Sequence, residues 1–188
     1  MNYLVLVNKQ NIIKDNYYDD VKFITVKDAT NLDIEVEEIT YKAYLKLKEF
    51  LETKNIYINL LSAYRSLKEQ QDVLDDYLAR YGEEYTNMYA APVGASEHHT
   101  GLALDIGLYI GDKVIIENDD LFANDSTFKE IHKYLDEFGF ILRYPENMES
   151  ITGYNYEPWH IRYVGSIAKK IKDTGLTLEE YLDKYGSE

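Results

Sequence analysis

Two short stretches, about fifty residues apart, constrain the fold more than any other feature of the sequence. Ser96–Asp105 reads Ser-Glu-His-His-Thr-Gly-Leu-Ala-Leu-Asp, and Glu157–His160 reads Glu-Pro-Trp-His. Together they offer imidazoles, one aspartate and a further glutamate. A catalytic zinc site needs these groups: three ligands, one open position for water, and an unligated carboxylate that moves a proton. The sequence therefore predicts a fold that brings the two stretches together around a single ion.

The composition excludes several other sites and partners. The chain has no cysteine, so disulfides are excluded and a zinc site must use His, Asp or Glu. The net charge of -14 opposes phosphate backbones and anionic membrane surfaces, so we expect no nucleic-acid partner. No apolar run approaches the ~20 residues of a transmembrane helix, and the N-terminus lacks signal-peptide features. We expect a cytoplasmic protein, with a trimmed exported or membrane-anchored form as the alternative.

The length and the hydrophobic periodicity predict one α+β domain spanning residues 1–188. Between Leu102 and Leu108 the apolar residues alternate, which places Leu104 and Ile106 on one face of a strand and Asp105 on the other. Strands are expected over Tyr3–Val7, Val21–Val26, Ile56–Leu61, Leu102–Leu108, Lys113–Ile116, Phe140–Arg143 and Trp159–Val164.

Helices are indicated by apolar spacing and by capping signals. Apolar residues recur at helical spacing from Glu37 to Lys54, and the pattern Ser/Thr-x-x-Glu predicts helix starts at Ser66, Thr127 and Thr177. The helix after Ser66 should end near Tyr81, because Gly82 follows. A further helical turn over Glu83–Met88, a helical segment over Ile167–Ile171 and loops over Asp15–Asp20 and Ala90–Ala95 complete the expectation.

Each candidate ligand also has an ordinary structural explanation. A lone histidine is more often a hydrogen-bonded polar group than a ligand, and His160 at the start of an apolar strand fits that description. Asp105 alone would be a turn or cap residue. His132 is assigned to surface or packing, and ligand chemistry alone does not choose between His98 and His99.

The motifs together resemble a known family. Ser96-x-His98-x-x-Gly101-x-Ala103-x-Asp105, followed by Glu157-Pro158-Trp159-His160, is similar to the zinc D,D-/L,D-carboxypeptidases of peptidoglycan, the VanY/VanX-like peptidases. The likeness spans roughly Leu4 to Gly165. The bifunctional VanXY-type enzymes fit best, on length, absence of an export signal and the Thr177–Tyr181 tail. Further matching stretches are Tyr64-Arg65-Ser66 with Gln70, Gly139–Pro145 and Ile151–Gly165.

This resemblance implies a fold and a ligand set. The fold would be a small central antiparallel sheet flanked by helices, hedgehog-like, with one Zn²⁺ in a cleft on the sheet. The zinc ligands would be His98, Asp105 and His160, which resolves His98 over its neighbour. His99 stands where we expect Gln in many relatives, and adds a titratable group beside the metal.

The resemblance also assigns roles to other side chains. Glu157 would take a proton from zinc-bound water and pass it to the leaving amine, with its pKa raised by desolvation beside Pro158 and Trp159. Arg65 would stabilise the oxyanion or bind a substrate carboxylate, and a structural salt bridge at the helix start is its alternative. Ser96, Gln70 and Trp159 would contact substrate, with capping, surface or packing roles as alternatives.

The implied function is hydrolysis of the C-terminal D-alanine from peptidoglycan precursor peptides, of the D-Ala-D-Ala dipeptide, or of both, a chemistry associated with glycopeptide-antibiotic resistance. An L,D-carboxypeptidase that trims tetrapeptide stems would use the same metal site. A phage-type cell-wall endopeptidase and a non-catalytic zinc-binding module are further alternatives. The presence of both Glu157 and Arg65 argues against the last, because neither is needed to hold zinc. Preference between dipeptide and pentapeptide stays open.

Overall fold

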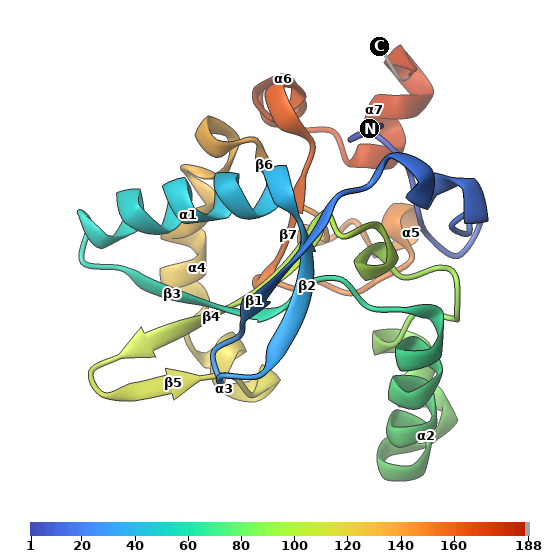
Figure 1. Cartoon of the computed structure of the whole chain (residues 1–188), viewed down its shortest axis with the longest axis horizontal. Coiled ribbons are helices and arrows are strands. Elements are labelled where there is room, and N and C mark those ends of the chain that lie inside the picture. The colour runs from blue at the N-terminus through green and yellow to red at the C-terminus, as the bar shows by residue number, and fades with distance from the viewer. Residues whose placement is uncertain (187–188) are drawn as a thin grey trace.

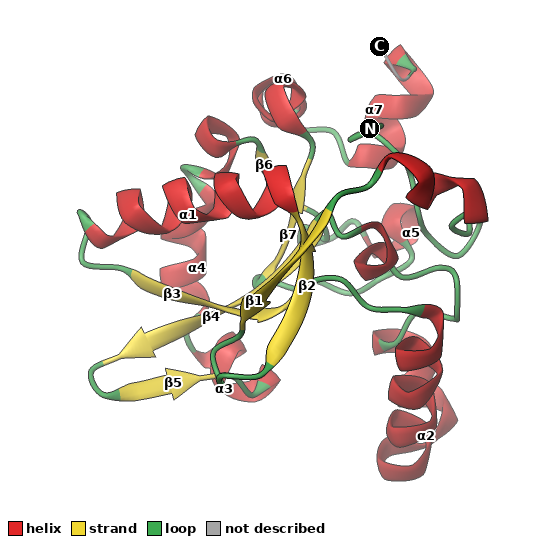
Figure 2. Cartoon of the chain, in the orientation of Figure 1, coloured by secondary structure: helices red, strands yellow, loops and turns green. Residues whose placement is uncertain are grey.

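A computed structural model describes residues 1–186, in which helices surround two antiparallel sheets (Figures 1 and 2). The larger sheet has the strand order β3-β4-β7-β6, with β5 paired to β4, and the smaller one pairs β1 with β2. The α+β expectation is thereby confirmed. The strands are β1 (Phe23–Lys27), β2 (Asp33–Glu37), β3 (Tyr57–Ser62), β4 (Ala103–Ile110), β5 (Lys113–Ile115), β6 (Phe140–Leu142) and β7 (His160–Tyr163).

The helices lie around the sheets, and α2 extends away from them at the lower right of Figure 1. No helix within residues 1–186 has the length and apolar character required to cross a membrane. The α-helices are α1 (Glu38–Glu52), α2 (Leu67–Tyr89), α3 (Asn118–Ala123), α4 (Asp125–His132), α5 (Glu149–Thr152), α6 (Ala168–Thr174) and α7 (Leu178–Tyr185), and the 3-10 helices are η1 (Asp15–Asp20), η2 (Glu97–Thr100), η3 (Leu135–Phe138) and η4 (Gly165–Ile167).

The main hydrophobic core covers one face of the larger sheet. Leu104 and Ile106 of β4 are fully buried there, together with Leu47 and Leu51 of α1. Because side chains alternate along a strand, Asp105 lies on the opposite face, as the sequence predicted. The face away from the main core is therefore free to carry polar groups.

The prediction of a first strand over Tyr3–Val7 is wrong, because no residue in this segment belongs to a strand in the described structure. Leu4 is nevertheless buried in a second hydrophobic cluster with Val164 and Ile171. The carbonyl oxygens of Tyr3 and Val5 accept hydrogen bonds of 3.0 and 2.7 Å from Nη2 of Arg162. The apolar pattern thus predicted burial correctly, but a guanidinium, and not a neighbouring strand, satisfies this backbone.

Two of the three expected capping boxes are confirmed, at Ser66 with Glu69 and at Thr177 with Glu180. The third is wrong, because Thr127 lies inside α4, which begins at Asp125 directly after α3. The chain is already helical when it reaches the Thr-x-x-Glu pattern, so no helix start remains to be capped.

Two smaller differences and one agreement concern local backbone structure. Asp15–Asp20 forms the 3-10 helix η1 and not an open loop, and β2 was not foreseen. At Gly82 the backbone leaves helical geometry, with φ 79° and ψ 174°, and helical residues resume up to Tyr89. This agrees with the expected break at Gly82 and the expected further turn after it.

Candidate active site

Pairing of β4 with β7 brings the two motif stretches together. These strands are antiparallel, and their register places Asp105 directly opposite His160. Just before β4, Gly101 adopts φ +70°, a conformation that favours glycine, and reverses the chain after η2. A Cβ atom at Gly101 would lie 2.6 Å from Cε1 of Phe23, so the turn also packs closely against β1. Because of this reversal, the side chain of His98 lies next to Asp105 in β4.

The ring of His98 is fixed by backbone contacts. Its Nδ1 donates to the carbonyl oxygen of Ala63 at 2.6 Å, and its own carbonyl accepts from the N–H of Arg65 at 3.1 Å. Since Nδ1 carries the proton, Nε2 keeps its lone pair and faces Oδ2 of Asp105 at 3.1 Å. The ring therefore presents an unprotonated nitrogen toward the strand pair.

One ligand atom from each of His98, Asp105 and His160 lies within 4.8 Å of the other two. Two imidazole nitrogens and one carboxylate oxygen form a donor set that suits Zn²⁺. Electrostatics agree: burial alone would lower the pKa of His160, but a hydrogen bond to Asp105 and the nearby Glu97 carboxylate raise it to about 9. The carboxylates of Asp105 and Glu97 thus favour positive charge at His160.

His99 lies outside this group, although it adjoins His98 in sequence. Its Nδ1 donates to the carbonyl oxygen of Arg65 at 2.6 Å, and its Nε2 accepts from the N–H of Gly94 at 3.1 Å. Burial lowers its pKa. Both ring nitrogens are occupied by backbone, so geometry separates the two neighbouring histidines where ligand chemistry did not. His132 instead hydrogen-bonds through Nε2 to the carbonyl oxygen of Pro158 at 2.8 Å.

The carboxylate of Glu157 lies next to the three-residue group. Its Oε2 is 3.8 Å from Nδ1 of His160, and its side chain is 14% exposed. Burial raises the pKa of Glu157 to about 7. A carboxyl group in that range can accept and return a proton near neutral pH.

Arg65 lies in the loop before α2, and its side chain lines the same pocket as Glu157 and the three proposed ligands. Its Nη1 donates to Oε1 of Gln70 at 3.0 Å, and its Nη2 donates to Oγ of Ser62 at 3.2 Å. Within residues 1–186 it forms no ion pair with a carboxylate, which removes the structural salt bridge considered above. Gln70 also donates to the carbonyl oxygen of Ala91 at 2.8 Å, so both ends of its amide are engaged. This geometry favours a role for Gln70 in positioning Arg65.

A cleft of about 210 Å³ unites these side chains. Ser96 and Trp159 line it as well, so every residue proposed from the sequence borders the same space. Several residues that line this cleft were not predicted from the sequence. Tyr144 and Tyr154 fall in stretches that carried the family resemblance, but tyrosines ordinarily indicate packing. The remaining lining residues are Val73, Tyr77, Tyr89, Ala90, Ala91, Glu97 and Asn118.

Comparison with known proteins identifies the family. Residues 33–166 match the model described as VanY, D-alanyl-D-alanine carboxypeptidase. The chain belongs to the VanY family. It is 37% identical to a D-alanyl-D-alanine carboxypeptidase of Enterococcus faecalis strain V583, over 96% of this chain and 65% of that protein. It is also 35% identical to the bifunctional D-Ala-D-Ala dipeptidase and carboxypeptidase VanXYC of Enterococcus gallinarum, over 97% of this chain and 95% of that protein.

Solved structures of related peptidases have the same fold as this chain, and they confirm the resemblance inferred from the motifs. The LdcB LD-carboxypeptidase gives a TM-score of 0.82 at 35% identity, covering 97% of this chain and 86% of that one. VanXYg, a D,D-dipeptidase in complex with a D-Ala-D-Ala phosphinate analogue, gives 0.80 at 34%, covering 97% and 71%. A variant of the D,D-pentapeptidase VanY in complex with Zn(II) gives 0.78 at 32%, covering 97% and 99%.

Proposed function

We propose that this VanY-family chain is a zinc-dependent peptidase that hydrolyses the C-terminal D-alanine from peptidoglycan precursor peptides, the D-Ala-D-Ala dipeptide, or both. The observation that carries the proposal is the convergence of His98, Asp105 and His160 within 4.8 Å, with the Glu157 carboxylate beside them. A binding module would need the ligands but not the adjacent carboxylate.

Zn²⁺ is the metal that the donor set supports. Two imidazoles and one carboxylate leave a coordination position open, as catalytic zinc sites do, and a VanY relative has been solved with Zn(II). Bound here, zinc would supply a Lewis acid that polarises the scissile carbonyl and acidifies a water molecule.

In this proposal Glu157 moves the proton. With a pKa near 7 it is partly ionised at neutral pH, so it can take a proton from the attacking water. The protonated carboxyl then gives that proton to the departing amine of D-alanine. No other carboxylate that lines the cleft has a raised pKa, which makes Glu157 the group suited to both steps.

Arg65 supplies fixed positive charge. Gln70 and Ser62 hold its guanidinium, so the group is oriented before substrate arrives. Such a group stabilises the oxyanion that forms on the carbonyl, or binds the terminal carboxylate of the substrate. Ser96 and Trp159 line the same cleft and contact the terminal D-alanine in this proposal.

A substrate panel tests the proposal. Zinc-loaded protein is incubated with D-Ala-D-Ala, with a pentapeptide stem ending in D-Ala-D-Ala, and with a tetrapeptide stem ending in a single D-alanine, and released D-alanine is measured. We expect release from one or both of the first two, and none after chelation. Release from the tetrapeptide alone would replace this proposal with the L,D-carboxypeptidase, which the similarity to LdcB favours. Bound zinc without release from any peptide would refute both.

A further inference from the structure

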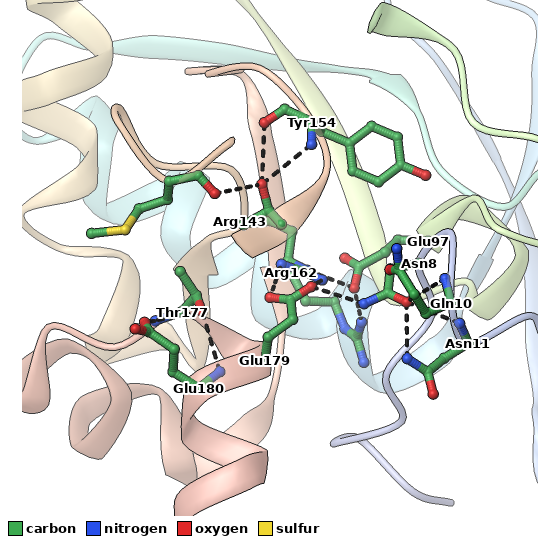
Figure 3. Close-up of polar contacts among 12 residues, drawn as sticks. Asn8, Gln10, Asn11, Glu97, Arg143, Tyr154, Arg162, Thr177, Glu179 and Glu180 are labelled. Carbon is green, nitrogen blue, oxygen red and sulfur yellow. Dashed lines mark hydrogen bonds and ion pairs between the residues drawn. The ribbon is translucent and has the colours of Figure 1, made fainter. Parts of the chain in front are cut away.

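Figure 3 shows a buried cluster of charged side chains formed by Glu97, Arg143 and Arg162. Glu97 places this cluster next to the proposed metal ligand His160. Glu97, Arg143 and Arg162 are each at most 1% exposed. Oε1 of Glu97 accepts hydrogen bonds from Nε of Arg143 at 2.7 Å and from Nη1 of Arg162 at 2.5 Å. Burying charges is unfavourable unless they are paired and hydrogen-bonded, so this cluster demands an explanation beyond packing.

The cluster is balanced in charge when Glu179 is included, and it contacts distant parts of the chain. Arg143 donates from Nη1 and Nη2 to the two carboxylate oxygens of Glu179 in α7, at 2.8 and 2.6 Å. Arg162 donates from Nη2 to carbonyl oxygens of the N-terminal segment, at 3.0 and 2.7 Å. Two guanidinium groups therefore hold the Glu97 carboxylate in one orientation.

Two atoms in this region have no hydrogen-bond partner among the described residues. They are Oε2 of Glu97 and Nε2 of His160, both buried, and they lie 3.8 Å apart. Leaving either group unpaired in the interior costs free energy. A relative movement of under about 1 Å would close an N–H···O hydrogen bond between them.

The orientation of His160 shows which of its nitrogens needs that bond. Its Nδ1 faces Oδ1 of Asp105 at 2.9 Å, so Nδ1 is the atom directed toward the other ligand candidates. A neutral imidazole can offer a lone pair at Nδ1 only when Nε2 carries the proton. That Nε2–H requires an acceptor, and the unpaired oxygen of Glu97 is the one in reach.

We infer that Glu97 is a positioning residue for His160: its carboxylate accepts the Nε2–H of this ring, fixes the tautomer, and directs Nδ1 to the metal. The inference rests on the zinc site of the proposed function. Carboxylates that orient histidine ligands in this way strengthen metal binding by 10- to 100-fold. Arg143 and Arg162 both donate to the other carboxylate oxygen of Glu97, Oε1. The cluster therefore connects α7 and the N-terminal segment to a proposed metal ligand.

Zinc affinity of two matched variants tests the inference. Glu97→Gln and Glu179→Gln each remove one carboxylate from the same Arg143, but only the first faces His160. Zinc dissociation constants are measured by competition with a chromophoric chelator. We expect binding about 10- to 100-fold weaker for Glu97→Gln and within about threefold of wild type for Glu179→Gln. Unchanged affinity in Glu97→Gln, or equal weakening in both variants, would overturn the inference.

A second measurement uses the unaltered protein and remains decisive if Glu97→Gln fails to fold. In zinc-loaded protein with ¹⁵N-labelled histidines, NMR should show His160 metal-bound at Nδ1 and protonated at Nε2, with an Nε2 proton that exchanges slowly with solvent. A proton on Nδ1, fast exchange at Nε2, or no zinc binding would each refute the inference. Neither measurement involves substrate, so an inactive protein with these zinc properties would refute the proposed hydrolysis alone.

Discussion

The short turn that precedes β7 sets the position of the Glu157 carboxyl group. Its N–H donates to the carbonyl oxygen of Tyr144 at 3.3 Å, and its own carbonyl accepts from the N–H of His160 at 3.2 Å. The turn thereby holds the carboxyl group in the cleft, where burial raises its pKa. The resemblance implied a raised pKa through desolvation of Glu157, and burial raises this pKa in the structure.

Replacing Glu157 with Gln should abolish most of the activity. Glutamine keeps the size of the side chain but cannot take up a proton, and general acid–base catalysis contributes about 10²- to 10⁴-fold. We expect kcat/KM for D-alanine release to fall by about this factor while zinc affinity stays near that of wild type. Glu149→Gln, at an exposed position in α5, serves as the control and should keep full activity. Undiminished turnover in Glu157→Gln would show that another group moves the proton.

The pH profile follows from the same residue. A general base works only when ionised, so activity is present above the pKa of Glu157 and is lost as the pH falls through it. The pKa of about 7 applies to Glu157 in the metal-free protein. A divalent cation bound next to the carboxylate lowers this pKa. We expect log(kcat/KM) to decline by about one unit per pH unit on the acid limb, measured over roughly pH 5 to 8. A rate that stays flat over this range would contradict the assignment.

At the scale of elements, the junction between η2 and β4 sets the position of His98, and Gly101 makes this junction. Substituting Ala there adds a Cβ only 2.6 Å from the Phe23 ring, at a backbone φ of +70°. The backbone strain and the overpacking should together lower the free energy of unfolding by about 2–4 kcal/mol. Urea unfolding curves of Gly101→Ala and wild type, recorded without metal, measure this loss.

Gly175→Ala is the matched control for that substitution. Gly175 also has a positive φ, of +66°, but apart from its chain neighbours no atom of residues 1–186 lies within 4 Å of the added Cβ. Only the backbone term remains, so we expect a loss of about 1 kcal/mol. Equal losses in the two variants would show that the contact with Phe23 contributes nothing, and that the turn tolerates a side chain.

At the scale of the whole molecule, the proposed metal ligands lie outside the main hydrophobic cluster. The chain should therefore keep its fold without zinc and lose only the stability that binding adds. We expect chelation to abolish hydrolysis and to preserve the far-UV circular dichroism. At zinc concentrations near 1,000 times the dissociation constant, binding adds about 4 kcal/mol, or about 8–16 °C in Tm for a chain of this length. Complete unfolding on chelation, or activity that zinc does not restore, would contradict this expectation.

Features whose physical causes lie within a few neighbouring residues could be predicted from the sequence. Alternation along β4 placed Asp105 opposite the core face, capping boxes set the starts of α2 and α7, and Gly82 interrupted helical geometry. The resemblance carried by the motif stretches added the family and the candidate ligands. Each of these signals is short-range or is written directly in residue identity, so it can be interpreted without knowing which segments meet.

Which distant groups share an environment depends on how the segments pack against one another, and the sequence does not show this. The register that places Asp105 opposite His160 depends on pairing between strands more than fifty residues apart. The burial of Glu97, Arg143 and Arg162 could not be predicted, because charged side chains are ordinarily exposed and become buried only when partners from remote segments neutralise them. For the same reason the Tyr3–Val7 segment was taken for a strand: its backbone partner is the guanidinium of Arg162, far along the chain.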